Sequence, residues 1–211
     1  MALQNQHTLI AREGRLLIVF SIVIASVLTY YFSFLTAGAS WLLPLLFAFL
    51  FRDPTRKVPS EPLAVVSPVD ARILSIAKCR DGYIDRNAVK IVLSMGPLDV
   101  FSVRSPIEGK VIHQWYVDEN VAVSDAPVFA QWIQTDENDD VLLAMFTGRF
   151  WRRPRNYIQF GDRVGQGQRC GFMSFGAVVE VYVPDTARIE IKEGQRVTAG
   201  ETVMAHFIHR G

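Results

Sequence analysis

The most constraining feature of this sequence is a stretch of 36 residues, Leu16–Phe51, that contains no aspartate, glutamate, lysine or arginine. Arg15 and Arg52 bound it on either side. A single straight helix of that length would be about 54 Å long, whereas the hydrocarbon core of a bilayer is about 30 Å thick. One span is therefore too long, and the stretch predicts a hydrophobic helical hairpin.

Small residues at 36–40 (TAGAS) are the natural place for the hairpin to turn. We expect a first helix over Leu16–Leu35 and a second, shorter one over Trp41–Phe51. About 20 apolar residues are needed to cross a bilayer, and the second arm has fewer. It is expected to tilt, to begin within the turn, or to enter the bilayer without crossing it.

Arginine and lysine residues on both flanks place the two ends of the hairpin on one side of the membrane, the cytoplasmic side. A cleaved signal peptide is disfavoured because its apolar region is only about 7–15 residues long. A buried hairpin in a soluble protein is disfavoured because the stretch has no polar face. We therefore expect a protein of the cell inner membrane with a soluble domain on the cytoplasmic face. The expected divisions are a tail over 1–15, the hairpin over 16–51, a linker over 52–62 and a β domain over 63–211.

Beyond the proline-containing linker, short runs rich in β-branched and aromatic residues alternate with turn residues. Many short strands at such spacing predict a mainly β domain, a sandwich or a barrel. No long amphipathic helix is visible, and Asp125–Gln134 is the stretch that could hold a short one. The expected strands are Ala64–Val66, Ala71–Ile76, Val89–Ser94, Gly109–His113, Val141–Phe146, Val178–Val183 and Arg188–Ile191.

Two internal sequence similarities refine the predicted fold. Residues 67–73 (SPVDARI) are similar to residues 105–111 (SPIEGKV), and residues 161–167 share the pattern G-x-R-V-x-x-G with residues 194–200. Each pattern places a glycine turn on either side of a short strand. The pattern resembles the half-repeat of the barrel-sandwich hybrid of biotinyl and lipoyl domains. No lysine–methionine tip is present, so carrier function does not follow from that fold.

The overall charge and the cysteines exclude some functions. The net charge of +1 predicts no nucleic-acid binding. Cys79 and Cys170 are far apart and lack metal-ligand spacing, so no metal site is expected. A reducing compartment fits two free thiols, and a disulfide between them stays open at this point.

Several motifs follow one another in a specific order: the hydrophobic hairpin, then FRDPTRKVP at 51–59, SPVDARI at 67–73, MGPLDVFSVRSPIEGKV at 95–111 and GDRVGQGQRCGFMSFGAVVEVYVP at 161–184. Taken together they resemble the short bacterial and archaeal type of phosphatidylserine decarboxylase proenzyme. The resemblance covers nearly the whole chain.

That resemblance implies a reaction and a cofactor. Loss of carbon dioxide from an amino acid leaves a carbanion, and the family stabilises it with a pyruvoyl group made from its own backbone. A serine hydroxyl attacks the preceding glycine carbonyl, the chain is cut, and the new N-terminus becomes pyruvoyl. The implied partners are a membrane and a phospholipid substrate, phosphatidylserine, which is converted to phosphatidylethanolamine. The resemblance also suggests a homodimer.

The match at the implied site residues is partial. Asp70 falls where the family has an acidic residue associated with activation of the serine, although a turn-capping role is the alternative. Asp99 matches a family aspartate. Phe101 and Arg104 occupy two positions at which the family carries histidine, and they are candidates for substrate binding. Neither side chain performs the proton transfer of a histidine near neutral pH.

Ala177 is the decisive departure, because it stands where the resemblance places the pyruvoyl-forming serine after Gly176. A methyl group has no oxygen, so the usual cut into chains 1–176 and 177–211 is blocked. Either the serine has been replaced in this sequence, which traps the precursor, or the chain is a diverged relative. A third alternative is that Ser174 attacks Met173.

A further group of basic residues, which includes Arg152 and Arg153, lies among aromatic residues at 149–157. These arginines are candidates for binding lipid phosphate, or they form a solvated loop. Three functional hypotheses remain: a pyruvoyl-dependent phospholipid decarboxylase, a non-catalytic lipid-binding relative, and a membrane-anchored adaptor. The adaptor is the weakest because the sequence lacks coiled-coil heptads.

Overall fold

A computed structural model describes residues 9–32, 37–61, 63–116, 129–146, 154–173 and 177–208. The chain divides into two compact units, Met1–Thr55 and Arg56–Gly211. The division falls within the segment that the sequence predicts as a linker. Each unit is described separately below.

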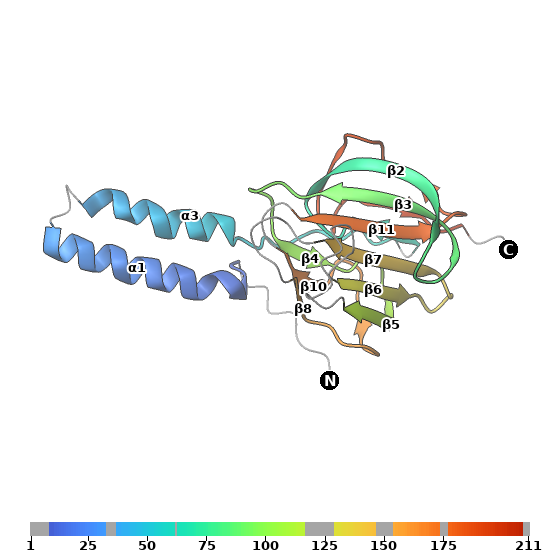
Figure 1. Cartoon of the computed structure of the whole chain (residues 1–211), viewed down its shortest axis with the longest axis horizontal. Helices are drawn as coiled ribbons and strands as arrows, with labels where there is room; N and C mark the ends of the chain where they lie inside the picture. Colours follow the sequence, from blue (N-terminus) through green and yellow to red (C-terminus); the bar gives the residue numbers. More distant parts are fainter. Residues whose placement is uncertain are drawn as a thin grey trace. The chain divides into compact units, whose positions relative to one another are not determined.

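The first unit is a pair of helices that run in opposite directions (Figure 1). Helix α1 spans Arg12–Phe32, and helix α3, Leu42–Leu50, follows a 3-10 turn, η1, over Gly38–Trp41. The helical hairpin predicted from the charge-free stretch is therefore observed. Helix α1 begins at Arg12 rather than at Leu16, because the loss of charge marks where the chain becomes apolar and not where the helix begins.

Backbone hydrogen bonds join the two ends of the hairpin. The amide of Ala11 donates to the carbonyl of Phe51 at 2.8 Å, and the amide of Asp53 donates to the carbonyl of Leu9 at 2.8 Å. Close contact here requires a glycine, since a Cβ on Gly14 would lie 2.3 Å from the Cβ of Phe51. Helix α1 is long and apolar enough to cross a membrane by length and composition, and α3 is shorter.

The second unit is mainly β, as the sequence predicts. Its largest sheet has eight strands in the order β13-β2-β3-β11-β7-β6-β5-β9, and it curls around the domain (Figure 1). The strands of this sheet are β2 (Ala71–Asp81), β3 (Arg86–Ser94), β5 (Gly109–Tyr116), β6 (Phe129–Gln134), β7 (Asp140–Phe146), β9 (Arg163–Val164), β11 (Val178–Pro184) and β13 (Arg196–Val197).

Two small sheets complete the domain, in the orders β1-β14-β12 and β4-β10-β8. Their strands are β1 (Ala64–Val66), β4 (Ser102–Arg104), β8 (Arg155–Asn156), β10 (Arg169–Phe172), β12 (Arg188–Ile189) and β14 (Val203–His206). The buried core is largely aliphatic, with Ile91, Leu93, Ile133, Leu143 and Val181 at 0% exposure. Cys79 and Cys170 are both free thiols, so no disulfide joins them.

The strand orders reveal an internal two-fold repeat. The large sheet reads β13-β2-β3-β11 from one edge and β9-β5-β6-β7 from the other, and the two small sheets follow the same plan. One half therefore consists of β1–β3 and β11–β14, and the other consists of β4–β10. The second half is inserted as one continuous piece into the first.

The pairs of similar sequence segments form turns at equivalent places in the two halves of this repeat. The Ser67 hydroxyl donates to the carbonyl of Val69 at 2.7 Å, and the Ser105 hydroxyl donates to the carbonyl of Ile107 at 2.7 Å. The glycines of the two G-x-R-V-x-x-G patterns all have positive φ: Gly161 (86°), Gly167 (68°), Gly194 (80°) and Gly200 (71°). The pattern found in the sequence is thus a structural repeat.

The prediction of a short helix within Asp125–Gln134 is wrong for the residues of this range that the structure describes. Phe129–Gln134 is strand β6, which pairs with β5 on one side and β7 on the other. Phe129, Gln131 and Ile133 alternate on a buried face, which is the period of a strand. Pairing on both sides decides the conformation here. Residues 125–128 lie outside the described residues.

Candidate functional site

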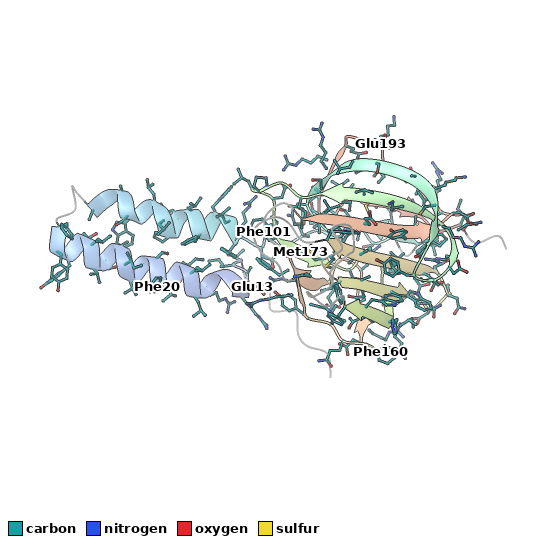
Figure 2. The ribbon with its side chains drawn as sticks, viewed as in Figure 1. Glu13, Phe20, Phe101, Phe160, Met173 and Glu193 are labelled. Atoms are coloured by element: carbon teal, nitrogen blue, oxygen red, sulfur yellow. The ribbon has the colours of Figure 1, made fainter. Side chains whose placement is uncertain are left out.

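The candidate site lies where the chain passes between the two halves of the repeat. Residues 95–101 lead from the first half into the second, and residues 173–177 lead back. The amide of Met95 donates to the carbonyl of Ala177 at 3.0 Å, and the amide of Met173 donates to the carbonyl of Phe101 at 2.8 Å. The first crossover therefore holds both ends of the second. Figure 2 labels Phe101 and Met173 at this contact.

Ala177 is at the C-terminal end of the returning crossover, directly before β11. It is 1% exposed, and only its backbone carbonyl takes part in the hydrogen bond to Met95. Gly176, the other residue of the predicted cleavage bond, and Ser174, the alternative nucleophile, lie outside the described residues. Ala177 itself is thus buried and held through its backbone carbonyl.

Phe101 is buried beside the same segment, at 1% exposure. Its ring lies edge-on to that of Phe172, with ring centroids 6.0 Å apart. The position at which the resemblance places a histidine is therefore next to the segment that ends at Ala177. An apolar ring fills it, so this side chain moves no proton.

Asp99 lies on the first crossover and is 7% exposed. Its Oδ2 accepts a hydrogen bond from the amide of Gly96 at 2.7 Å, and its Oδ1 forms an ion pair with Arg196. Asp99 also lines an open pocket of about 470 Å³ together with Arg72, Ser94, Gly96, Gly194 and Arg196. Ser94 and Gly96 flank Met95, so the pocket adjoins the residue that is bonded to Ala177.

Asp70 has a different setting. Its Oδ2 accepts a hydrogen bond from the Arg56 guanidinium at 2.6 Å, and its Oδ1 accepts one from the amide of Ala199 at 2.7 Å. The carboxylate therefore caps a turn of the repeat and ties the linker residue Arg56 to the domain. The capped amide belongs to a turn far away in the sequence, and the role of Asp70 in activating a serine stays a prediction.

Arg104 is buried at the junction of the two halves, at 7% exposure. Its amide donates to the carbonyl of Pro68 at 2.8 Å, and its guanidinium donates to the carbonyl of Gly167 at 3.0 Å. The structure thus brings Asp99, Phe101 and Ala177 together on the two crossovers. It places Asp70 and Arg104 at the turns of the repeat. Arg152 and Arg153 lie outside the described residues, and their predicted role stays a prediction.

The side chain at position 177 cannot form a pyruvoyl group. That group is made from a serine hydroxyl, and residue 177 carries a methyl. The described part of the chain contains no group of three His, Cys, Asp or Glu side chains placed to hold a metal ion.

Comparison with known proteins agrees with the sequence motifs. The sequence profile of the family "Phosphatidylserine decarboxylase" matches residues 43–205. The chain is 35% identical to a phosphatidylserine decarboxylase proenzyme of Nitrosomonas eutropha in an alignment of 208 positions that covers 95% of this chain and 96% of the relative. It is 37% identical to a proenzyme of the same name from Aromatoleum aromaticum in an alignment of 213 positions that covers 95% of this chain and 97% of the relative.

The fold and the two crossovers define a mainly β protein with an inserted internal repeat and an N-terminal apolar hairpin. The extent of these matches shows that the chain belongs to the phosphatidylserine decarboxylase family. The resemblance deduced from the motifs is therefore confirmed at the level of the family.

Sequence reasoning missed the partners of the two aspartates. Arg56 is 14 residues from Asp70, and Arg196 is 97 residues from Asp99. Both arginines belong to motifs that the sequence does display, the linker FRDPTRKVP and the second G-x-R-V-x-x-G pattern. The sequence analysis assigned no role to either arginine, and only the fold shows which carboxylate each one meets.

Proposed function

We propose that this chain is a membrane-bound, phospholipid-binding member of the family that remains a single uncleaved chain. The observation that carries the proposal is Ala177. The returning crossover is held at Met173 and Ala177 by residues 95–101, but the side chain at position 177 has no nucleophilic atom. A hydroxyl is needed there for the chain to make its own cofactor.

The surroundings of this segment support the same conclusion. Phe101 and Arg104 stand at the two positions where the resemblance places histidine. Both are buried, and neither exchanges a proton near neutral pH. General acid–base catalysis typically contributes about 10²–10⁴-fold to a rate. The hydroxyl and both histidines are therefore absent together, although Asp70 is retained.

Membrane association is supported by the first unit. Helix α1 is of spanning length, and its large side chains Leu16, Val19, Phe20, Val23 and Val27 are about half or more exposed. Contiguous exposed apolar surface of this kind needs a nonpolar environment. Arginines beyond both ends of the hairpin favour the cytoplasmic face, so we place the β domain at the cytoplasmic surface of the inner membrane.

The bound lipid is proposed to be a serine phospholipid. The support is the family itself, whose members named above are phosphatidylserine decarboxylase proenzymes. Without cleavage, the chain binds the lipid and does not decarboxylate it. A role in sensing or presenting phosphatidylserine at the membrane follows.

The test restores the missing groups in two stages. The full chain is produced in membranes as Ala177→Ser and as the triple variant Ala177→Ser with Phe101→His and Arg104→His, and intact mass is measured after purification. We expect Ala177→Ser to stay essentially whole and the triple variant to yield fragments 1–176 and 177–211 at least about 100-fold faster.

Two outcomes contradict the proposal. Complete cleavage of Ala177→Ser would mean that a single residue separates this chain from a working proenzyme, so the divergence argument is wrong. No binding of the unaltered chain to phosphatidylserine in vesicles, compared with phosphatidylcholine vesicles, would remove the lipid-binding role. The two fragments of the triple variant would stay associated through the pairing of β11 with β3 and β7, so both would be purified together and detected by mass.

A further inference from the structure

Phe160 is a large aromatic side chain that lies in solvent at the tip of a tight turn, where it is 70% exposed. The amide of Asp162 donates to the carbonyl of Gln159 at 3.1 Å, and the amide of Gln159 donates to Oδ2 of Asp162 at 2.8 Å. Gly161 has a φ of 86°, and its amide donates to the carbonyl of Val111 at 2.9 Å. The ring therefore projects from a turn that is fixed on both sides.

The other half of the repeat contains the same turn without an aromatic residue. The amide of Gln195 donates to the carbonyl of Lys192 at 3.2 Å, and the amide of Lys192 donates to Oε1 of Gln195 at 3.1 Å. Gly194 has a φ of 80°. Glu193 occupies the position equivalent to Phe160, at the opposite end of the β domain (Figure 2). The turn forms without phenylalanine, so its folding does not account for the exposed ring.

Acidic side chains predominate around Phe160. Arg163, which follows the turn, lies opposite Lys110 and pairs at 2.6 Å with Asp136 in the turn between β6 and β7. The charged residues of this Phe160 end are the cations Lys110 and Arg163 and the anions Glu108, Asp136, Glu137, Asp139 and Asp162. Two positive and five negative charges leave a net charge of about −3.

The opposite end of the domain holds an open pocket of about 470 Å³. Its lining consists of Arg72, Ser94, Gly96, Asp99, Gly194 and Arg196. The Nε of Arg72 donates to the carbonyl of Gly194 at 2.9 Å, which fixes this arginine beside the second turn. The charged residues of this pocket end are the cations Arg72, Lys192 and Arg196 and the anions Asp99 and Glu193. Three positive and two negative charges leave a net charge of about +1, opposite in sign to the Phe160 end.

The pocket end also carries exposed apolar side chains. Leu74, in the bulge of β2, and Leu98, which precedes Asp99 on the first crossover, are both more than half exposed. Sites for small ligands have volumes of about 300–1,000 Å³, so a pocket of this volume admits one aromatic ring. Guanidinium groups stack favourably on aromatic faces. The pocket end therefore suits an aromatic side chain that an acidic surface surrounds.

We propose that the two ends bind each other between copies of this chain, with Phe160 of one protomer in the pocket of its partner. Opposite charges favour a second copy as the occupant, because the acidic and basic ends belong to the same domain. The two surfaces differ, so the contact is head to tail, and it adds further copies unless a ring closes. Association closes the pocket that adjoins the first crossover. This inference depends neither on lipid binding nor on the absence of cleavage.

The experiment uses the full chain in detergent micelles, with self-association measured by sedimentation velocity over a range of protein and salt concentrations. Phe160→Glu gives the first turn the residue that the equivalent turn carries. Arg72→Glu reverses a charge in the pocket. Leu74→Glu is a second pocket variant that keeps the hydrogen bond of Arg72. Ile208→Glu is the matched control, since it removes a half-exposed apolar side chain that belongs to neither end.

Phe160→Glu and each pocket variant should raise the dissociation constant for self-association at least about 10-fold, because an aromatic side chain in a pocket carries much of the affinity of an interface. Ile208→Glu should leave it within about two-fold. Added salt should weaken the association of the unaltered chain, because screening reduces the attraction between the two ends. Near-ultraviolet circular dichroism reports whether each variant is folded.

A mixture of two variants tests the head-to-tail geometry. Chains with Phe160→Glu keep an intact pocket, and chains with Arg72→Glu keep an intact ring. A pair of the two therefore has one complete contact. We expect the mixture to form pairs as tightly as the unaltered chain and to form no larger assembly. Energy transfer from donors on one variant to acceptors on the other detects these pairs in phosphatidylcholine vesicles.

Four results would overturn the inference. They are unchanged association of Phe160→Glu, an equal loss in Ile208→Glu, no pairs in the mixture, and an unaltered chain that never exceeds two copies. Contact of the ring with lipid is tested separately by a polarity-sensitive fluorophore on Phe160→Cys in a Cys79→Ser background. Its emission in vesicles should shift to the blue as protein density rises. A blue shift that is independent of density would place position 160 in the lipid and contradict the proposal.

Discussion

Gly167 and Gly161 are a matched pair for testing how the linker docks on the β domain. Both have positive φ, 68° and 86°, so alanine at either position is strained by about 1–2 kcal/mol. A Cβ on Gly161 would meet nothing within 4 Å, whereas a Cβ on Gly167 would lie 2.4 Å from Cγ2 of Val58. Overpacking costs about 1–3 kcal/mol. Gly167→Ala is therefore expected to be more destabilising than Gly161→Ala by about 1–3 kcal/mol.

The assay is urea-induced unfolding of the full chain in detergent micelles, followed by tryptophan fluorescence. Val58→Ala removes the colliding methyl groups, so in a double-mutant cycle it should recover most of the extra cost of Gly167→Ala and none of the cost of Gly161→Ala. Equal destabilisation by the two glycine variants, or no rescue by Val58→Ala, would refute the docking of the linker at Gly167.

Three further predictions concern other buried groups. Arg56→Ala leaves the partly buried Asp70 carboxylate without its ion pair and should lower the free energy of unfolding by about 1–3 kcal/mol at pH 7, measured by urea unfolding; an unchanged free energy would contradict this. Gln131 is 0% exposed and its amide has no hydrogen-bond partner among the described residues, so Gln131→Leu should raise thermal stability by about 1–2 kcal/mol, and a lower melting temperature would contradict this. Burial raises the pKa of Cys170 from 9.0 to about 12 and that of Tyr83 from 10.0 to about 12. Between about pH 9 and 12 the folded state keeps protons on these groups that the unfolded state loses, so the free energy of unfolding should fall as the pH rises through this range; below pH 9 their full contribution is present. Tyr83→Phe should make this fall less steep when unfolding by urea is measured at several pH values.

The repeat was the part of the fold most accessible from the sequence. Positive φ at four turns requires glycine, and glycine at those turns is what makes the G-x-R-V-x-x-G pattern visible. The hairpin was equally accessible, because the absence of charge over 36 residues leaves few alternatives. Both features depend on local chemistry that each segment carries in its own residues.

Contacts between strands and between the two crossovers explain the features that could not be predicted from the sequence. Phe129–Gln134 becomes a strand because β5 and β7 pair with it on either side, β7 through a hairpin whose turn spans residues 135–139. The same holds for the candidate site. Ala177 was found from a motif, but the contact of residues 95–101 with Met173 and Ala177 arises because one half of the repeat is inserted into the other.

The insertion also gives the site its location. Two crossovers are needed to leave the first half and to return to it, and hydrogen bonds at Met95 and Met173 hold them together. A cut between residues 176 and 177 would separate β11–β14 from the rest of the first half, while the ladders to β3 and β7 would keep them bound. These ladders would therefore keep the two pieces of the domain together after a cut at this bond.

The measurement that tests this account most directly is the intact mass of the unaltered chain purified from its membrane. The account predicts one species with the mass of all 211 residues and a normal amino terminus. Two species that correspond to residues 1–176 and 177–211 would contradict it, because they would show that the chain is cut at this bond without a hydroxyl at position 177.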